Sequence, residues 1–212
     1  TFIHSQMSAL MSARRDPNLS GTPGDKRLAI SKAAVKVFAQ RGFFNAQVAD
    51  VARSAGVAAG TVYLYFRSKD EILISIFERT MKEAITESRL ALDGVSDPVD
   101  RLRCLARLHL QRLGRDRDLA VVFQVELRQS TKFMEQLSSS QFRTYLGQLR
   151  DAIAEGQASG VFTTTVNPTL AAKALFGALD EMATNWILSR RRYDLASEAD
   201  AVVNLFVNGL VT

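Results

Sequence analysis

Residues 45–70, NAQVADVARSAGVAAGTVYLYFRSKD, decide the fold of this chain. They predict a short helix, a turn around Gly56, a second short helix and the start of a third helix. The first helix has an apolar face built from Val48, Val51 and Ala52. The second helix carries hydroxyl groups, on Thr61, Tyr63 and Tyr65. This layout is typical of a helix-turn-helix, whose second helix enters the major groove of DNA.

The composition is that of a globular chain with a core of its own. The 212 residues are 47% hydrophobic and 23% charged, which suits one or two domains. We expect no transmembrane helix and no signal peptide, since no 18-residue uncharged apolar run and no cleavage pattern is present. The lone cysteine, Cys104, cannot form an internal disulfide and is predicted to be a core thiol. These features favour a cytoplasmic protein without a membrane partner.

Positive charge is concentrated in the N-terminal third of the chain. Residues 1–70 contain ten Lys and Arg against four Asp and Glu, whereas residues 71–212 contain 17 against 18. A local excess of positive charge suits binding to a polyanion. A solvated basic surface is the alternative that charge alone leaves open.

The apolar periodicity predicts an all-α protein. We expect a disordered arm over 1–24, a helix-turn-helix DNA-binding domain over 25–70 and a larger helical domain over 71–212, joined through a helix over 68–92. Asn45 is the expected N-cap of the second helix, and Ser68 with Glu71 matches a capping box. A possible extended stretch lies near 161–166. The remaining helices are predicted over 25–41, 46–54, 98–113, 118–130, 133–158, 168–189 and 196–210, with Gly114, Gly160 and Pro168 between helices.

Residues 26–76 resemble the N-terminal domain of the TetR family of transcriptional repressors. The resemblance is carried by G56-V57-A58-A59-G60-T61-V62-Y63-L64-Y65-F66 followed by R67-S68-K69-D70. It implies a three-helix DNA-binding domain followed by a helical domain for ligand binding and dimerisation. Ala59 and Ala46 depart from the family pattern, which often has a basic residue and a hydroxyl there. The DNA-binding candidates are Gln47, Ala58, Ala59, Gly60, Thr61, Tyr63, Tyr65 and Lys69.

The chemistry of these candidates agrees with that role. Gly60 permits close approach to the duplex, and the Thr61 and Tyr63 hydroxyls can donate to phosphates or base edges. Lys69 is expected to pair with a phosphate beside a positive helix end. For the two tyrosines, a place in the core is the alternative. Leu64 and Phe66 are expected to anchor the helix to that core, and Arg53 is a further candidate for reading DNA.

A second resemblance, to the TetR-type regulators of fatty-acid degradation, covers most of residues 26–210. It is carried by I72–F77, D118–S130, F176–E181, W186 and Y193–L195. It implies a repressor of fatty-acid degradation genes that long-chain acyl-CoA releases from its operator, with no cofactor. A TetR-type repressor that responds to another amphiphile, such as a drug or a free fatty acid, is the alternative.

An acyl-CoA requires a long apolar tunnel with a cationic mouth. At about 0.8 kcal/mol per buried CH₂, an acyl chain of about 12–18 carbons binds tightly without polar recognition, and arginines suit the coenzyme phosphates. Ordinary core packing with snorkelling arginines is the alternative. Asp180 is expected to line the pocket, pair with Arg128 or face solvent. The candidate ligand-binding residues are Leu105, Leu108, Arg112, Phe123, Leu127, Arg128, Phe176, Met182 and Trp186.

The last two predicted helices suit a homodimer. A four-helix bundle across a two-fold axis would place two recognition helices on a pseudo-palindromic operator. Burial of the same faces inside the monomer is the alternative. The residues expected at this interface are Leu170, Ala174, Ala178, Met182, Val203, Phe206 and Leu210.

Catalysis is not expected from this sequence. His4 and His109 are the only histidines, and no nucleophile elbow, catalytic triad, metal-spaced set or phosphate loop accompanies them. His109 is predicted to be a core or pocket-wall residue. A constitutive architectural DNA-binding protein is the other non-enzymatic alternative.

Overall fold

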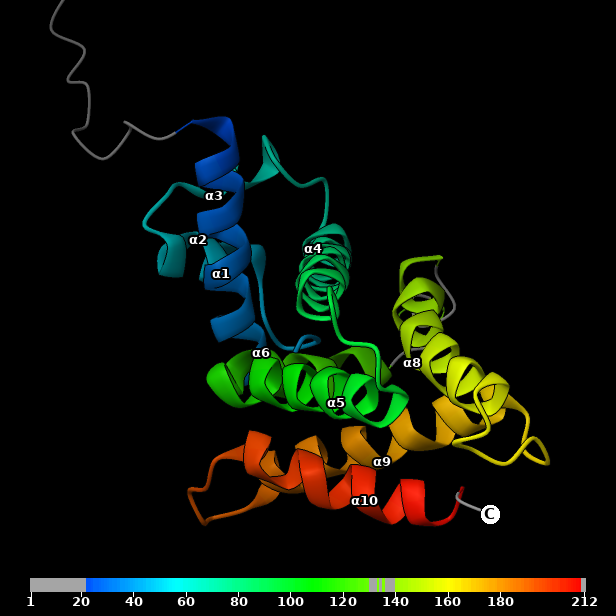
Figure 1. Ribbon diagram of the computed structural model, residues 1–212. Coiled ribbons are helices and arrows are strands. Elements are labelled where there is room, and N and C mark those ends of the chain that lie inside the picture. Colours follow the sequence, from blue (N-terminus) through cyan, green and yellow to red (C-terminus); the bar gives the residue numbers. More distant parts are fainter. Residues whose placement is uncertain (1–21, 130–132, 134, 136–139, 211–212) are drawn as a thin grey trace, which may run out of the picture.

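The computed structural model describes residues 22–129, 133, 135 and 140–210, which form helices joined by short connections (Figure 1). No strand occurs within these ranges, and the all-α prediction is confirmed. The stretch near 161–166 forms turns, so the possible extended segment was wrong. Most of the predicted arm lies outside the described residues. Its last part was wrong, because the first helix already begins at Pro23.

The first three helices are set by local caps. Helix α1 (Pro23–Arg41) starts at Thr22 and ends at Gly42, whose φ of 75° is left-handed. Helix α2 (Val48–Ala55) ends at Gly56 in the left-handed αL conformation. Helix α3 (Ala59–Tyr63) follows after a three-residue turn. The buried side chains that hold the three helices together include Phe38, Val51, Val62 and Phe66.

Asn45 is not the N-cap of α2, contrary to the prediction. The N-cap is Gln47, whose backbone N–H donates to the Asp50 carboxylate at 3.1 Å. The Asn45 amide instead donates to the carbonyl of Arg41 at 3.3 Å, back toward the end of α1.

Helix α4 (Lys69–Ala91) connects the N-terminal helices to the rest of the chain. The Ser68 hydroxyl accepts from the backbone N–H of Glu71 at 3.1 Å, as a capping box predicts. The Glu71 carboxylate accepts from the N–H of Arg67 at 2.7 Å. The first half of α4 is buried against α1, whereas Met81 and Ala84 lie farther along, against the larger domain. Helix α4 therefore packs against both the helix-turn-helix and the larger domain.

The larger domain starts with α5 (Pro98–Arg115), and Figure 1 shows α5 and α6 between the N-terminal helices and the pair α9–α10. Gly114 lies inside α5 and does not end it, contrary to the prediction. The predicted helix over 118–130 is split at Val125, and the first part of the one over 133–158 lies largely outside the described residues. The remaining elements are α6 (Arg117–Gln124), the 3₁₀ helix η1 (Glu126–Arg128), α8 (Ser140–Ala158), α9 (Pro168–Leu188), the 3₁₀ helix η3 (Leu195–Glu198) and α10 (Ala199–Asn208).

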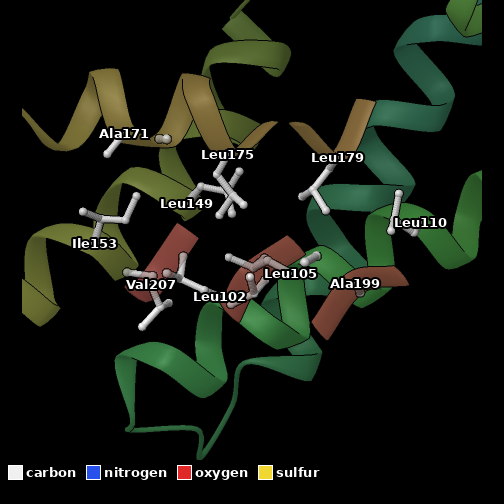
Figure 2. Packing of buried hydrophobic residues seen from close by; sticks show 14 of the residues in the cluster. Leu102, Leu105, Leu110, Leu149, Ile153, Ala171, Leu175, Leu179, Ala199 and Val207 are labelled. Carbon is white, nitrogen blue, oxygen red and sulfur yellow. The ribbon is translucent and has the colours of Figure 1, made fainter. Parts of the chain in front are cut away.

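Two hydrophobic clusters stabilise the molecule. The cluster in Figure 2 joins Leu102 and Leu105 of α5 to Leu149 of α8 and Leu175 of α9. The other cluster joins the helix-turn-helix to α4 and to α6–η1, including Val122 and Leu127. The N-terminal helices therefore share a core with the larger domain. None of the described helices combines the length and apolarity needed to cross a bilayer.

Candidate functional site

The second helix of the helix-turn-helix presents its hydroxyl groups to solvent. Tyr63 is 56% exposed, so its alternative place in the core is excluded. Thr61 and Tyr65 are half-buried, and Tyr65 packs in part against the core. The other candidates around this helix are exposed: Gln47, Ala58, Ala59 and Gly60. Their contacts with DNA stay predictions.

Two apolar side chains of the helix-turn-helix are exposed to solvent, which was not predicted from the sequence. Leu64 is 81% exposed, so its expected role as a core anchor was wrong. Val62 and Phe66 occupy the inward positions on either side of it. Phe44, in the loop before α2, is 59% exposed. Exposed apolar groups beside a reading helix are suited to contact thymine methyl groups.

Lys69 has a structural role that the sequence did not indicate. Its ammonium donates to the carbonyls of Phe43, Phe44 and Ala46 at 2.6, 3.1 and 2.8 Å. It also lies over the Phe43 ring, 4.5 Å from the centroid. All three donors are thus engaged within the protein, and a phosphate contact would require Lys69 to leave these carbonyls.

A largely enclosed cavity of about 40 Å³ lies between α4, α5, α6, α8 and α9. Four of the nine candidate ligand-binding residues line it, namely Arg112, Phe123, Arg128 and Phe176. Six further wall residues were not singled out as ligand contacts: Phe77, Thr80, Met81, Ala84, Leu113 and Phe142. The polar part of the wall includes His109, Gln124, Tyr145 and Asp180.

The other candidate ligand-binding residues lie elsewhere. Leu105 is buried in the core of the larger domain, and Met182 packs against that core. Leu127 is buried in the core shared with the helix-turn-helix. Leu108 faces a surface groove. Trp186 lines a separate basic groove of about 490 Å³ at the surface, together with Arg115, Arg117 and the run 190–192.

Asp180 both lines the cavity and pairs with Arg128, two of the possibilities that the sequence left open. Its carboxylate accepts a hydrogen bond from the Gln124 amide at 2.6 Å and an ion-paired hydrogen bond from Arg128. The Thr184 hydroxyl completes the set through the Gln124 carbonyl oxygen at 3.2 Å. This network joins α9 to α6 and η1, so the cavity wall is tied together across three elements.

His109 and Tyr145 form a second polar pair in the wall. Nδ1 of His109 lies 2.8 Å from the tyrosine hydroxyl, and the Phe176 ring stands edge-on to the imidazole at 5.4 Å between centroids. The pKa of His109 is lowered to about 4, chiefly by burial, while Asp180 raises it and Arg112 lowers it. Burial also raises the pKa of Tyr145. Both side chains are therefore neutral at physiological pH.

Arg112 separates the cavity from a surface groove of about 900 Å³ between α4 and α5. Its guanidinium forms ion pairs with Glu87 and, at 3.6 Å, with Glu83, both on α4. Arg79 and Lys82 add positive charge along the same groove. An anionic group that enters here would compete with two α4 carboxylates for Arg112.

A buried carboxylate links the larger domain to the helix-turn-helix. Glu126 of η1 is only 4% exposed and accepts the backbone N–H of Phe43 at 2.6 Å. The Phe43 ring also stands edge-on to Phe133, with 4.9 Å between centroids. The loop before α2 is thus held from one side by Glu126 and from the other by Lys69. Glu126 went unnoticed because it sits in an apolar run of sequence.

Only some of the residues expected at a dimer interface are exposed on the monomer surface. Leu170, Ala174 and Ala178 of α9 are exposed, but Val203 and Leu210 are buried inside the monomer, so for these two the prediction was wrong. Leu205 of α10 is exposed instead. No cluster of metal-ligating side chains occurs in the part of the chain that the structure describes.

The sequence comparisons agree with this architecture. Residues 30–76 match the bacterial regulatory proteins of the tetR family, and residues 77–209 match the C-terminal region of YsiA-like protein. The fatty acid metabolism regulator protein of Bacillus subtilis (strain 168) is 35% identical over 185 residues, covering 87% of this chain and 95% of that protein. The chain belongs to the TetR family.

Solved structures of TetR-family regulators superpose on nearly the whole described chain. The regulator FadR from Bacillus subtilis, in complex with stearoyl-CoA, has a TM-score of 0.81 at 34% identity, with 86% of this chain and 98% of that chain covered. The fatty acid degradation regulator FadR from Bacillus halodurans has a TM-score of 0.79 at 37% identity and the same coverage. The protein is a DNA-binding transcriptional regulator and not an enzyme, as expected.

Proposed function

We propose that this TetR-family regulator represses fatty-acid degradation genes and that a long-chain acyl-CoA releases it from its operator. The observation that carries the proposal is the position of the interior cavity. Its wall is built from α4, α5, α6, α8 and α9, and two of these helices also hold the helix-turn-helix. The complex of the Bacillus subtilis relative with stearoyl-CoA supports the ligand class.

The DNA-binding form is a cytoplasmic homodimer on a pseudo-palindromic operator. The exposed faces of α9 and α10 supply the apolar surface for the two-fold contact, through Leu170 and Leu205. Each protomer presents Tyr63 and the exposed residues around it to one major groove. No cofactor is needed for this activity.

An acyl chain cannot enter without movement of the helices. The cavity of about 40 Å³ has room for a water molecule or two, whereas ligand pockets typically measure about 300–1,000 Å³. The ligand must therefore bind a more open arrangement of these helices. Because it binds that arrangement better, it shifts the protein toward it.

Two sets of contacts connect the opening of the cavity to the helix-turn-helix. On one side, Arg112 and its two carboxylate partners tie α5 to α4, and α4 continues into the helix-turn-helix. On the other side, Phe123 and Arg128 line the cavity while Glu126 between them holds Phe43. A coupling of about 1–3 kcal/mol would weaken operator binding by about 5- to 150-fold.

A gel shift on the chain's own upstream DNA tests the proposal. We expect palmitoyl-CoA to release the DNA and palmitate and CoA alone to leave it bound. Release by palmitate alone would favour the alternative of a free fatty acid as the ligand. A complex that survives all three compounds would contradict the assignment to fatty-acid degradation and leave the TetR-family membership intact.

A further inference from the structure

One polar atom in the cavity wall has no partner. His109 Nε2 is buried and makes no hydrogen bond within the described structure, although Nδ1 on the same ring is paired with Tyr145. A buried polar atom without a partner costs about 1–3 kcal/mol. A ligand group that pairs with this atom is therefore bound more tightly than one that leaves it without a partner.

The missing partner can be identified from the chemistry of the pair. If the Tyr145 hydroxyl donates to Nδ1, the imidazole proton is on Nε2 and Nε2–H lacks an acceptor. If Nδ1 carries the proton and donates to the tyrosine oxygen, the tyrosine O–H is the free donor. The pair thus has a free donor in both tautomers. An acceptor oxygen on the ligand can accept from that donor in either case, and in the first tautomer it pairs Nε2 itself.

The rest of the wall favours an uncharged acceptor. Arg112 is paired with the α4 carboxylates, and Arg128 is paired with Asp180. The Gln124 amide is engaged by Asp180 and Thr184. A carboxylate buried beside His109 would therefore lack a free positive charge to compensate it. A carbonyl oxygen needs only the free donor.

We propose that His109 and Tyr145 bind the thioester carbonyl oxygen of the ligand and so distinguish a thioester from the matching thioether. This assignment rests on the proposed function, since only an acyl-CoA brings such a group. The acyl chain then lies along the aromatic wall formed by Phe77, Phe123 and Phe176. The coenzyme A part of the bound ligand extends past Arg112 into the groove between α4 and α5.

The test compares the dissociation constants of palmitoyl-CoA and S-hexadecyl-CoA, which has a CH₂ group in place of the carbonyl. We expect the thioether to bind wild-type protein about tenfold more weakly, the effect of one hydrogen bond. His109→Leu removes the donor of the first tautomer and Tyr145→Phe that of the second, so at least one of them should bring the ratio close to one. Met81→Leu, which changes the same wall without a polar atom, should shift both affinities together and keep the wild-type ratio. Circular dichroism and thermal unfolding show which variants are folded.

The outcomes separate this assignment from the proposed function. Equal binding of the two ligands by wild-type protein would overturn the carbonyl assignment alone, as would a tenfold ratio that persists in both folded polar variants. Tighter binding of palmitate than of palmitoyl-CoA would also overturn it, because a carboxylate would then be the acceptor. Failure of both coenzyme A compounds to bind would overturn the proposed function and this assignment with it.

Discussion

The hydrogen bond from the backbone N–H of Phe43 to Glu126 offers the most direct test of the proposed coupling between the cavity and the helix-turn-helix. Glu126→Ala removes a buried acceptor at 2.6 Å and leaves the backbone N–H of Phe43 buried without a partner. Hydrogen bonds to charged groups contribute about 1.5–3 kcal/mol, and the orphaned donor costs a similar amount. We expect the free energy of unfolding to fall by about 2–3 kcal/mol. At about 2–4 °C per kcal/mol for a chain of this size, Tm falls by about 4–12 °C.

The same contact should affect the response to ligand. Glu126→Gln keeps an acceptor oxygen and loses the charge, so it should cost about 1 kcal/mol of stability and remain folded. With this variant we expect palmitoyl-CoA to reduce operator affinity several-fold less than in wild-type protein, because the loop before α2 is held less firmly to η1. Fluorescence anisotropy on labelled operator, with and without ligand, measures the coupling.

Glu155→Ala is the matched control. Glu155 is an exposed residue whose carboxylate lies 3.2 Å from Arg101, and surface ion pairs contribute at most about 1 kcal/mol. Its removal should change neither the unfolding midpoint by more than a few degrees nor the ligand response. If Glu126→Ala were as stable as Glu155→Ala, and if Glu126→Gln responded fully to ligand, the assignment of Glu126 as a connection between cavity and DNA-binding head would be refuted.

Three further outcomes are expected. Tyr63→Ala should weaken operator binding by about two- to tenfold while Tm and dimer mass stay unchanged, as anisotropy and light scattering can show; undiminished affinity would exclude a DNA contact. Lys69→Gln should lower stability by about 1–3 kcal/mol without changing the slope of log K against log salt, whereas a slope smaller by about one would reveal a phosphate contact after all. Because the pKa of His109 falls from 6.5 to about 4 on folding, the unfolded chain binds the extra proton, so stability is lost as pH falls from 6.5 toward 4. Between about pH 7.5 and pH 5 the free energy of unfolding should fall by about 2 kcal/mol from this cause. His109→Leu should not show this part of the pH dependence in urea unfolding. An unchanged pH dependence in that variant would mean that His109 is not buried in its neutral form among Tyr145, Arg112 and Asp180.

The helix-turn-helix could be read from the sequence because its signals are local. The turn at Gly56 and the cap at Ser68 act within a few residues, and the structure follows both. The start of α2 could not be read in this way. Lys69 holds the preceding loop from 23 to 26 residues away, and Glu126 holds it from 83 residues away, so Asn45 does not decide where the helix begins.

The cavity wall was less predictable, since an apolar stripe on a helix does not show whether it faces a core or a cavity. Leu105 and Arg112 both belong to α5, yet Leu105 is buried in the core and Arg112 lines the cavity. One signal was available: His109, Arg112 and Leu113 are spaced i, i+3, i+4 and share a helical face. A histidine and an arginine on one face of a leucine-rich helix would have marked the polar side of the wall.

The distribution of buried polar groups shows how function and stability are separated in this molecule. The core in Figure 2 is apolar. Among the described residues, Ser31 and Ser88 are buried polar residues that donate to carbonyls of their own helices. By contrast, the buried Gln124 and Asp180 lie in the cavity wall and Glu126 lies beside it in the chain. Apolar residues of similar volume in place of the whole network of Gln124, Asp180 and Arg128 would often give an equally stable or more stable protein. Under the proposed function, these polar contacts give an arrangement that a ligand can change, and the hydrogen bond from Phe43 to Glu126 would carry that change to the helix-turn-helix.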